Sequence, residues 1–175
     1  RSSTCAGGVE LQGAYSERRA IAEAELIQEA ELPESIMEEE MGKLTGKVAI
    51  ITGATSGIGK ATALLFADEG AELVITGRRE ELGKAVETEI RRKGVRCVFV
   101  QADHSQADAC SSVLKRTLAE YGHVDILFNN AGIVTKGTAE TTSDEIWNET
   151  LAINVTAVWR MNKLVIPHMK KQGGG

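Results

Sequence analysis

The chain has 175 residues, of which 42% are hydrophobic and 26% are charged, and its formal net charge is −5. This composition is typical of one soluble globular domain and excludes a disordered or fibrous chain. The charge is uneven, because residues 1–42 carry ten acidic and three basic side chains while the rest carries fifteen acidic and seventeen basic ones. The nearly neutral remainder has no basic stripe that could follow a phosphate backbone, so we expect no nucleic-acid partner.

Membrane segments and metal sites are also not expected. No apolar run is long enough to span a bilayer, and no charged-then-apolar leader follows Arg1. The cysteines are Cys5, Cys97 and Cys110, which lack the paired spacing of a zinc site or a disulfide framework. We therefore expect a reduced, cytoplasmic protein with no metal and no membrane partner.

Residues 1–42 are interpreted as an acidic, helix-favouring extension. The segment from Tyr15 to Leu32 is rich in Ala and Glu, and Pro33 ends it because proline restricts the residue before it as well. Charges lie all round this predicted helix, so we expect a solvated leader and no specific interaction element. The domain that follows is predicted to comprise residues 43–175.

In that domain, short apolar segments alternate with helical ones. The predicted strands are Val48 to Thr52, Glu72 to Thr76, Val95 to Gln101 and Val124 to Phe128. The predicted helices are Ile58 to Glu69, Glu80 to Arg92, Ala107 to Tyr121 and a long fourth helix over residues 143–170. Continuous apolar runs suit strands buried on both faces of a parallel sheet. Right-handed crossovers then predict an α/β, Rossmann-type doubly wound sheet.

Polar residues mark the starts of the last two helices. Ser105 and Asp108 frame the third helix, and Thr142 and Glu145 have the spacing of a capping box before the fourth. In a doubly wound sheet, ligands bind outside the carboxyl ends of the strands, near the point where the winding direction reverses. The loops that follow the strands are therefore predicted to carry the binding site.

The first of these loops is glycine-rich and has the sequence Thr52-Gly53-Ala54-Thr55-Ser56-Gly57-Ile58-Gly59. Its glycines allow a tight turn and a close backbone approach, and the helix start directs free N–H groups at an anion such as a pyrophosphate. The alternative is that the loop is only a packing solution. A nucleoside-triphosphate loop is excluded, because Ala54 and Ala61 occupy the positions where it needs glycine and a hydroxyl residue.

Two asparagine motifs follow this loop along the chain. Asn129 to Gly132 has the sequence Asn-Asn-Ala-Gly directly after the fourth predicted strand, and Asn154 begins Asn-Val-Thr in the long helix. In type, order and spacing, these motifs and Thr52 to Gly59 resemble those of the short-chain dehydrogenase/reductase family. The resemblance covers residues 44–175 and implies an oxidoreductase that transfers hydride between NADP(H) and a small-molecule carbonyl or alcohol substrate. It also implies a homo-oligomer that associates through the helix of residues 143–170.

The resemblance further implies the residues that bind the cofactor. They are Gly53, Thr55, Ser56, Gly57, Ile58, Gly59, Arg78, Asp103, His104, Asn130, Ala131 and Gly132. Asp103 is implied to meet the adenine amino group, and His104 is expected to contribute its backbone and not its imidazole. Asn130 to Gly132 are implied to contact the cofactor ribose, whereas Asn129 is interpreted as structural.

Asn154 is the one catalytic residue that the resemblance implies. In the family, its position in the helix holds a water molecule of the proton relay. The alternative is an amide that stabilises a helix kink. Ile153 and Val155 on either side favour a buried polar group.

The end of the second predicted strand bears on the choice of cofactor. Gly77 occupies the position where an acidic residue would bind the ribose hydroxyls of NAD, and Arg78 and Arg79 follow it. Guanidinium groups suit a 2′-phosphate, so we expect NADP, with NAD as the alternative, and assign the contact to Arg78. Arg79 is interpreted as capping or solvating the second helix beside Glu80 and Glu81.

The tyrosine, lysine and serine that complete the family's chemistry cannot be assigned. Tyr15 and Tyr121 have no lysine four residues later, and the sequence ends at Gly175, before the position of that motif. His123 and His168 have no partner at catalytic spacing. We therefore expect the N-terminal half of the fold, with about four strands, in a C-terminally incomplete chain that is inactive by itself.

Two other functions are weighed against this interpretation. The first is a non-catalytic dinucleotide-binding or interaction module, which would use the apolar side chains of the long helix. These are Trp147, Leu151, Val158, Trp159 and Leu164. The second is a methyltransferase on a similar sheet, which is disfavoured because the second strand is not followed by an acidic ribose ligand.

Overall fold

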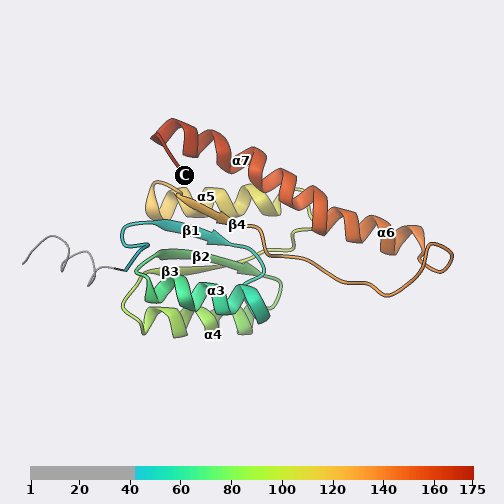
Figure 1. Ribbon diagram of the computed structural model, residues 1–175, viewed down its shortest axis with the longest axis horizontal. Coiled ribbons are helices and arrows are strands. Elements are labelled where there is room, and N and C mark those ends of the chain that lie inside the picture. Colours follow the sequence, from blue (N-terminus) through green and yellow to red (C-terminus); the bar gives the residue numbers. More distant parts are fainter. Residues whose placement is uncertain (1–41) are drawn as a thin grey trace, which may run out of the picture. The chain divides into compact units, whose positions relative to one another are not determined.

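The computed structural model describes residues 42–175, so the extension predicted for residues 1–42 lies outside the described residues except for Gly42. The sheet has the strand order β3-β2-β1-β4, and all three pairings are parallel (Figure 1). Its strands are β1 (Val48–Ile51), β2 (Glu72–Gly77), β3 (Cys97–Gln101) and β4 (Ile126–Phe128). The predicted α/β, Rossmann-type parallel sheet is confirmed.

Strand β1 lies inside the sheet and is buried on both faces. Side chains alternate between the faces of a strand, so Ala49 and Ile51 belong to one apolar cluster and Ile50 to the other. All four residues of β1 are buried. A continuous apolar run, and no alternation of apolar and polar residues, is what such a strand requires.

Helices cover both faces of the sheet. Figure 1 shows α3 (Gly57–Asp68) and α4 (Glu80–Arg91) on one face and α5 (Ala109–Tyr121) and α7 (Ala157–Gln172) on the other. The first face packs on helix residues with small or branched side chains, namely Ala63, Ala67, Val86 and Ile90. The second packs on Cys110, Val113, Met161 and Val165. No helix among residues 42–175 is both long and apolar enough to cross a membrane.

The predicted start of the third helix is wrong. Helix α5 begins at Ala109, and the residue before it, Asp108, makes no side-chain capping hydrogen bond. Ser105 does not cap it either, because it lies three residues before the N-cap position at Asp108, in a turn where its backbone N–H donates to the Asp103 carboxylate at 3.0 Å. Ser105, which the sequence pattern placed at the helix start, therefore belongs to a local turn after β3.

The predicted capping box of the fourth helix is also wrong, by one residue. Ser143 is the N-cap of α6 (Asp144–Leu151), with an extended backbone and a hydroxyl that accepts from the Ile146 N–H at 3.4 Å. The Thr142 hydroxyl instead donates to the carbonyl of Thr138 at 2.8 Å. Thr142 therefore lies one residue before the N-cap, and its hydroxyl bonds within the preceding loop.

The long fourth helix consists of three parts. Helix α6 continues through a π-helical turn, η1 (Ala152–Thr156), into α7 without leaving helical backbone angles. A π turn inserts one extra residue into the hydrogen-bond ladder and occurs often at functional sites. Here the turn contains Asn154, so the inserted residue lies beside the predicted site.

Candidate functional site

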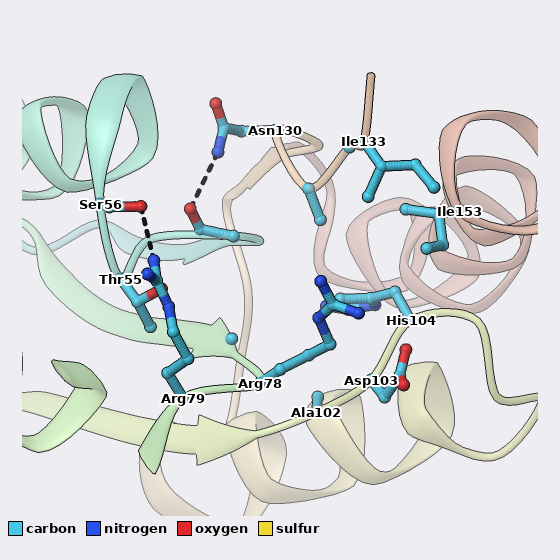
Figure 2. A pocket seen from close by; sticks show the side chains of 14 residues that line it. Thr55, Ser56, Arg78, Arg79, Ala102, Asp103, His104, Asn130, Ile133 and Ile153 are labelled. Atoms are coloured by element: carbon cyan, nitrogen blue, oxygen red, sulfur yellow. Dashed lines mark hydrogen bonds between the residues drawn. The ribbon is translucent and has the colours of Figure 1, made fainter. Parts of the chain in front are cut away.

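A cavity of about 400 Å³ lies at the carboxyl ends of the strands. The loops after all four strands contribute to it, and so does the π-helical turn (Figure 2). The chain adds β2 and β3 on one side of β1 and β4 on the other, so the winding direction reverses next to β1. The lining residues are Gly53, Thr55, Ser56, Gly77, Arg78, Arg79, Ala102, Asp103, His104, Asn130, Ala131, Gly132, Ile133 and Ile153.

Most of the residues predicted for the site line this cavity. They are Gly53, Thr55, Ser56, Arg78, Asp103, His104, Asn130, Ala131 and Gly132. Gly57, Ile58, Gly59 and Asn154 do not line it. Ile58 is 73% exposed, and Gly59 is buried in the first turn of α3. The cavity is also lined by Gly77 and Arg79, to which the sequence assigned no ligand contact, and by Ala102, Ile133 and Ile153, which belong to no motif.

The glycine-rich loop approaches the segment after β4 more closely than any side chain would allow. Gly53 has φ +69°, and a Cβ there would lie 2.8 Å from the Cα of Ala131. A larger residue would therefore be strained by its backbone angle and would also collide with the facing main chain. The close approach forms the wall of the cavity between β1 and β4.

Thr52 and Asn130 hold these two segments together. The Thr52 hydroxyl accepts from the backbone N–H groups of Asn130 at 3.0 Å and Ala131 at 2.9 Å. In return, the Asn130 amide donates to the carbonyls of Thr52 at 2.9 Å and Gly53 at 3.1 Å. Both amide hydrogens thus bond to the loop, so the side chain of Asn130 fixes the shape of the site. Asn129 donates to Asn162 of α7 at 3.1 Å and does not line the cavity.

The two arginines after β2 point in different directions (Figure 2). Arg79 donates to the hydroxyls of Ser56 at 2.8 Å and Thr55 at 3.2 Å. Arg79 is the exposed N-cap residue of α4, as the sequence suggested, but its side chain makes no capping hydrogen bond and instead reaches these two hydroxyls of the glycine-rich loop. Arg78 extends toward Asp103 and His104. Neither guanidinium has a carboxylate partner within ion-pair distance in the described part of the chain, so the cavity is positively charged.

The side chains after β3 form the opposite wall. The Asp103 carboxylate accepts the Ser105 N–H at 3.0 Å, and this bond lowers the pKa of Asp103. The His104 ring is buried, with Nε2 2.8 Å from the Thr76 hydroxyl and Nδ1 3.8 Å from the Cys110 sulfur. Burial lowers the pKa of His104, which favours the neutral ring. His104 lines the cavity while both nitrogens of its ring lie against buried side chains, so the backbone contact to a cofactor stays a prediction.

Asn154 connects the π-helical turn to the loop after β4. Its amide oxygen accepts from the Ile133 N–H at 2.9 Å, and its amide nitrogen donates to the Ile133 carbonyl at 2.8 Å. The expectation of a buried setting is wrong, because Asn154 is exposed and Val155 is 57% exposed, while only Ile153 is buried. Successive residues of a helix point in different directions, so apolar neighbours in sequence do not bury a side chain.

Residues 42–175 offer no proton donor at the cavity comparable to a tyrosine. Tyr121 is their one tyrosine, and its hydroxyl donates to the Leu73 carbonyl at 3.1 Å, away from the lining residues. Burial raises the pKa of Tyr121 further. Within the same range, no cluster of His, Cys, Asp and Glu could hold a metal ion. The described site can bind and orient an anionic ligand, but it contributes no obvious acid.

Sequence comparison relates the chain to known oxidoreductases. A family model described as short chain dehydrogenase matches residues 47–175. An uncharacterized oxidoreductase from Thermotoga maritima is 43% identical over 130 residues, which are 74% of this chain and 51% of that protein. The chain spans about half the length of the curated relatives it matches.

Two solved structures share the fold and have been determined with a nicotinamide cofactor. A metagenomic short-chain oxidoreductase in complex with NADP matches with a TM-score of 0.72 and 34% identity, over 75% of this chain and 60% of that one. The 3-ketoacyl-(acyl-carrier-protein) reductase from Brucella melitensis, complexed with NADH, matches with a TM-score of 0.69 and 38% identity. This match covers 74% of this chain and 52% of the reductase.

Proposed function

The chain belongs to the short-chain dehydrogenase family, and on that basis we propose that residues 43–175 are the dinucleotide-binding domain of an NADP-dependent oxidoreductase. One observation carries this proposal. A cavity at the carboxyl ends of parallel strands combines a close-packed glycine-rich loop with two guanidinium groups that have no carboxylate partner among residues 42–175. Such a cavity suits an extended, multiply charged phosphate ligand.

The residues present fit a dinucleotide in shape and in charge. The N–H groups of Thr55 and Ser56, which line the cavity just before α3, would meet the pyrophosphate at the helix start, and Ala131 and Gly132 would meet a ribose. The lowered pKa of Asp103 favours its charged carboxylate, which would accept a hydrogen bond from the adenine amino group. When bound, the nicotinamide supplies the hydride that is exchanged with a carbonyl or alcohol carbon.

The argument for NADP depends on the residues after β2, because one solved relative holds NADP and another NADH. A Cβ at Gly77 would lie 3.2 Å from the Thr55 hydroxyl and closer still to its methyl group, so an acidic side chain there would displace Thr55. Arg78 and Arg79 follow Gly77 directly, and their side chains extend in different directions from the end of β2 (Figure 2). We therefore extend the predicted phosphate contact from Arg78 to Arg79, with Ser56 and Thr55 orienting the second guanidinium.

Affinity measurements on the 175-residue chain test this proposal. Removing either guanidinium, as Arg78→Ala or Arg79→Ala, should weaken NADPH by about 1.5–3 kcal/mol, or roughly 10- to 150-fold. NADH, which lacks the 2′-phosphate, should change far less. Arg92→Ala, at the far end of α4, is the matched control. Equal affinity of the unchanged chain for NADPH and NADH would contradict the assignment of NADP.

Asn154 is better described as a positioning residue for this function. Both ends of its amide are bonded to the Ile133 backbone, which holds the segment of Ala131 and Gly132 against the cavity. A direct role in proton transfer stays a prediction from the resemblance. The substrate remains at the level of a carbonyl or alcohol, because the described lining residues select no particular one.

We propose that the whole protein is a homo-oligomer that associates through α6 and α7. The supporting observation is a row of exposed apolar side chains on these helices, in which Trp147 is 58% exposed and Trp159 is 56% exposed. Leu164, in contrast, packs against the core. Sedimentation of the chain and of Trp159→Lys tests this proposal, since the substitution should shift the distribution to monomer.

A further inference from the structure

A chain of buried polar groups runs beneath the cavity, outside the phosphate-binding loop. Thr76 on β2 and Cys110 on α5 are fully buried, and His104 between them is 5% exposed. The Thr76 hydroxyl lies 2.8 Å from His104 Nε2, and the Cys110 sulfur lies 3.8 Å from His104 Nδ1. The Cys110 thiol in turn donates to the carbonyl of Ala157 at 3.8 Å.

The donors and acceptors among these buried groups determine the protonation state of the His104 ring. We assign the Cys110 hydrogen to the Ala157 carbonyl, because that oxygen can only accept, and this assignment makes the sulfur an acceptor toward His104 and places the ring proton on Nδ1. Nε2 then has a free lone pair, which the Thr76 hydroxyl donates to. Every group has a partner only when the imidazole is neutral. A protonated ring would present N–H groups to both neighbours and force the Thr76 hydroxyl to reverse.

The hydrogen-bonded groups Thr76, His104 and Cys110 contact both sides of the proposed dinucleotide site. The Thr76 carbonyl accepts from the N–H of Ala54 in the glycine-rich loop at 2.8 Å. At the other end, Ala157 directly follows the π-helical turn that contains Asn154. His104 itself lines the cavity beside Asp103. A rearrangement of this ring would therefore reach the phosphate loop, the adenine wall and the π turn together.

The charges around the ring oppose its protonation. Among residues 42–175, Asp103 on the same loop is the one carboxylate that favours the charged ring, and its Oδ1 accepts from the Ser105 N–H. Arg78 extends toward the ring from the end of β2, and Arg160 on α7 acts on Cys110 behind it. Burial lowers the pKa of His104 and outweighs the effect of Asp103. Acid must therefore place a proton on a poorly compensated buried group.

We propose that His104 is a positioning residue that holds the cavity in its binding form only while its imidazole is neutral, so that dinucleotide affinity falls in acid. This inference rests on the proposed dinucleotide function and adds a pH sensor to it. The sign follows from linkage, because the ligand binds the form that lacks the proton. By reciprocity, bound dinucleotide must make His104 harder to protonate.

The sequence contains three histidines, which makes a direct test practical. In a His123→Gln/His168→Gln background, one imidazole remains, and its NMR titration reports His104 alone. His104→Gln in the same background is the non-titrating variant, since its amide can accept from Thr76 and donate to Cys110. NADPH dissociation constants are measured for both proteins from pH 8 down to a pH at which the NMR titration shows the ring of His104 mostly protonated, and their ratio cancels the titration of the ligand phosphate.

The affinity ratio should change in one direction only. At the pH of half-protonation, the dissociation constant of the His104 protein should be about doubled relative to His104→Gln, rising toward about tenfold per further pH unit. In the NMR titration, saturation with NADPH should move the midpoint of His104 to lower pH. This second measurement does not depend on the folding of His104→Gln.

The outcomes separate the two proposals. A flat affinity ratio, tighter binding in acid, or a midpoint that NADPH leaves unchanged or raises would overturn the role of His104 while leaving the dinucleotide function intact. If neither protein bound NADPH at pH 7.5, the proposed function would fail, and the inference about His104 would fail with it.

Discussion

Replacing Gly59 by alanine tests whether the third glycine of the loop is required for packing. Gly59 is buried in the first turn of α3. A Cβ at this position would lie 2.5 Å from the Gly53 carbonyl oxygen and closer still to the amide nitrogen of Asn130. Gly59→Ala must therefore displace either the Asn130 side chain or the backbone of the glycine-rich loop.

The cost can be estimated from the bonds that would be disturbed. Moving the Asn130 amide breaks its bonds to the carbonyls of Thr52 and Gly53, each contributing about 0.5–1.5 kcal/mol net. Moving the backbone instead is overpacking, which costs about 1–3 kcal/mol. Alanine regains up to about 1 kcal/mol of helix propensity. Setting this gain against a cost of about 1–3 kcal/mol, we expect a net loss of about 0.5–2 kcal/mol in the free energy of unfolding.

Urea denaturation of Gly59→Ala, with Gly57→Ala as the matched control, measures this loss. Gly57 has φ +57° and open space around it, so its alanine variant suffers only the cost of the left-handed backbone. Adding Asn130→Ala should relieve Gly59→Ala and leave the cost of Gly57→Ala unchanged, because only the first variant collides with that side chain. A Gly59→Ala chain as stable as the unchanged chain, or additive effects with Asn130→Ala, would refute this reasoning.

Two further predictions concern the same site. Thr52→Val should cost about 1–3 kcal/mol, because the N–H groups of Asn130 and Ala131 lose their acceptor. Thr52→Ser should restore most of that stability, and equal urea midpoints for the two variants would contradict the role of the hydroxyl. The 175-residue chain should bind NADPH without oxidising it in the presence of ketones or aldehydes, since loss of general acid catalysis typically costs about 10²–10⁴ in rate. Turnover comparable to that of a full-length relative, followed by NADPH absorbance, would show that these residues include an acid.

The strands could be predicted because a strand buried on both faces requires a continuous run of apolar residues in the sequence. β1 and β2 differ from the prediction by one residue at their ends, whereas β3 and β4 each begin two residues later. Val95 and Val124, where those two strands were expected to start, both pack in the core. Apolar character reports burial, and burial begins before the ladder of hydrogen bonds does.

The parts of the site that are formed by backbone contacts could be predicted from the sequence. The hydrogen bonds between side chains distant in sequence could not. Gly53 and the segment from Asn130 to Gly132 meet because parallel strands place their loops together. Arg79 was assigned to α4 because its acidic neighbours are local, while its actual partners, Ser56 and Thr55, are more than twenty residues away. No local sequence pattern predicts a hydrogen bond between side chains so far apart in the sequence.

His104 shows the same limit in the core. Its partner Thr76 is 28 residues earlier and Cys110 is 6 residues later, so the polar chain exists only after β2, β3 and α5 have packed. The sequence provides a histidine after a strand and nothing that says where its ring points. The expectation of a backbone role was the simpler interpretation of that position.

Shape and charge are supplied by different residues in this site. Thr52, Asn130 and Asn154 bond to the main chain and fix the positions of the loops, but they carry no charge. Arg78 and Arg79 carry the charge, and the loops do not depend on them for their backbone hydrogen bonds. Exchanging the arginines should therefore alter the choice between phosphorylated and unphosphorylated dinucleotides with little loss of stability. Exchanging the uncharged residues should weaken both dinucleotides together, because it moves the walls that both ligands contact.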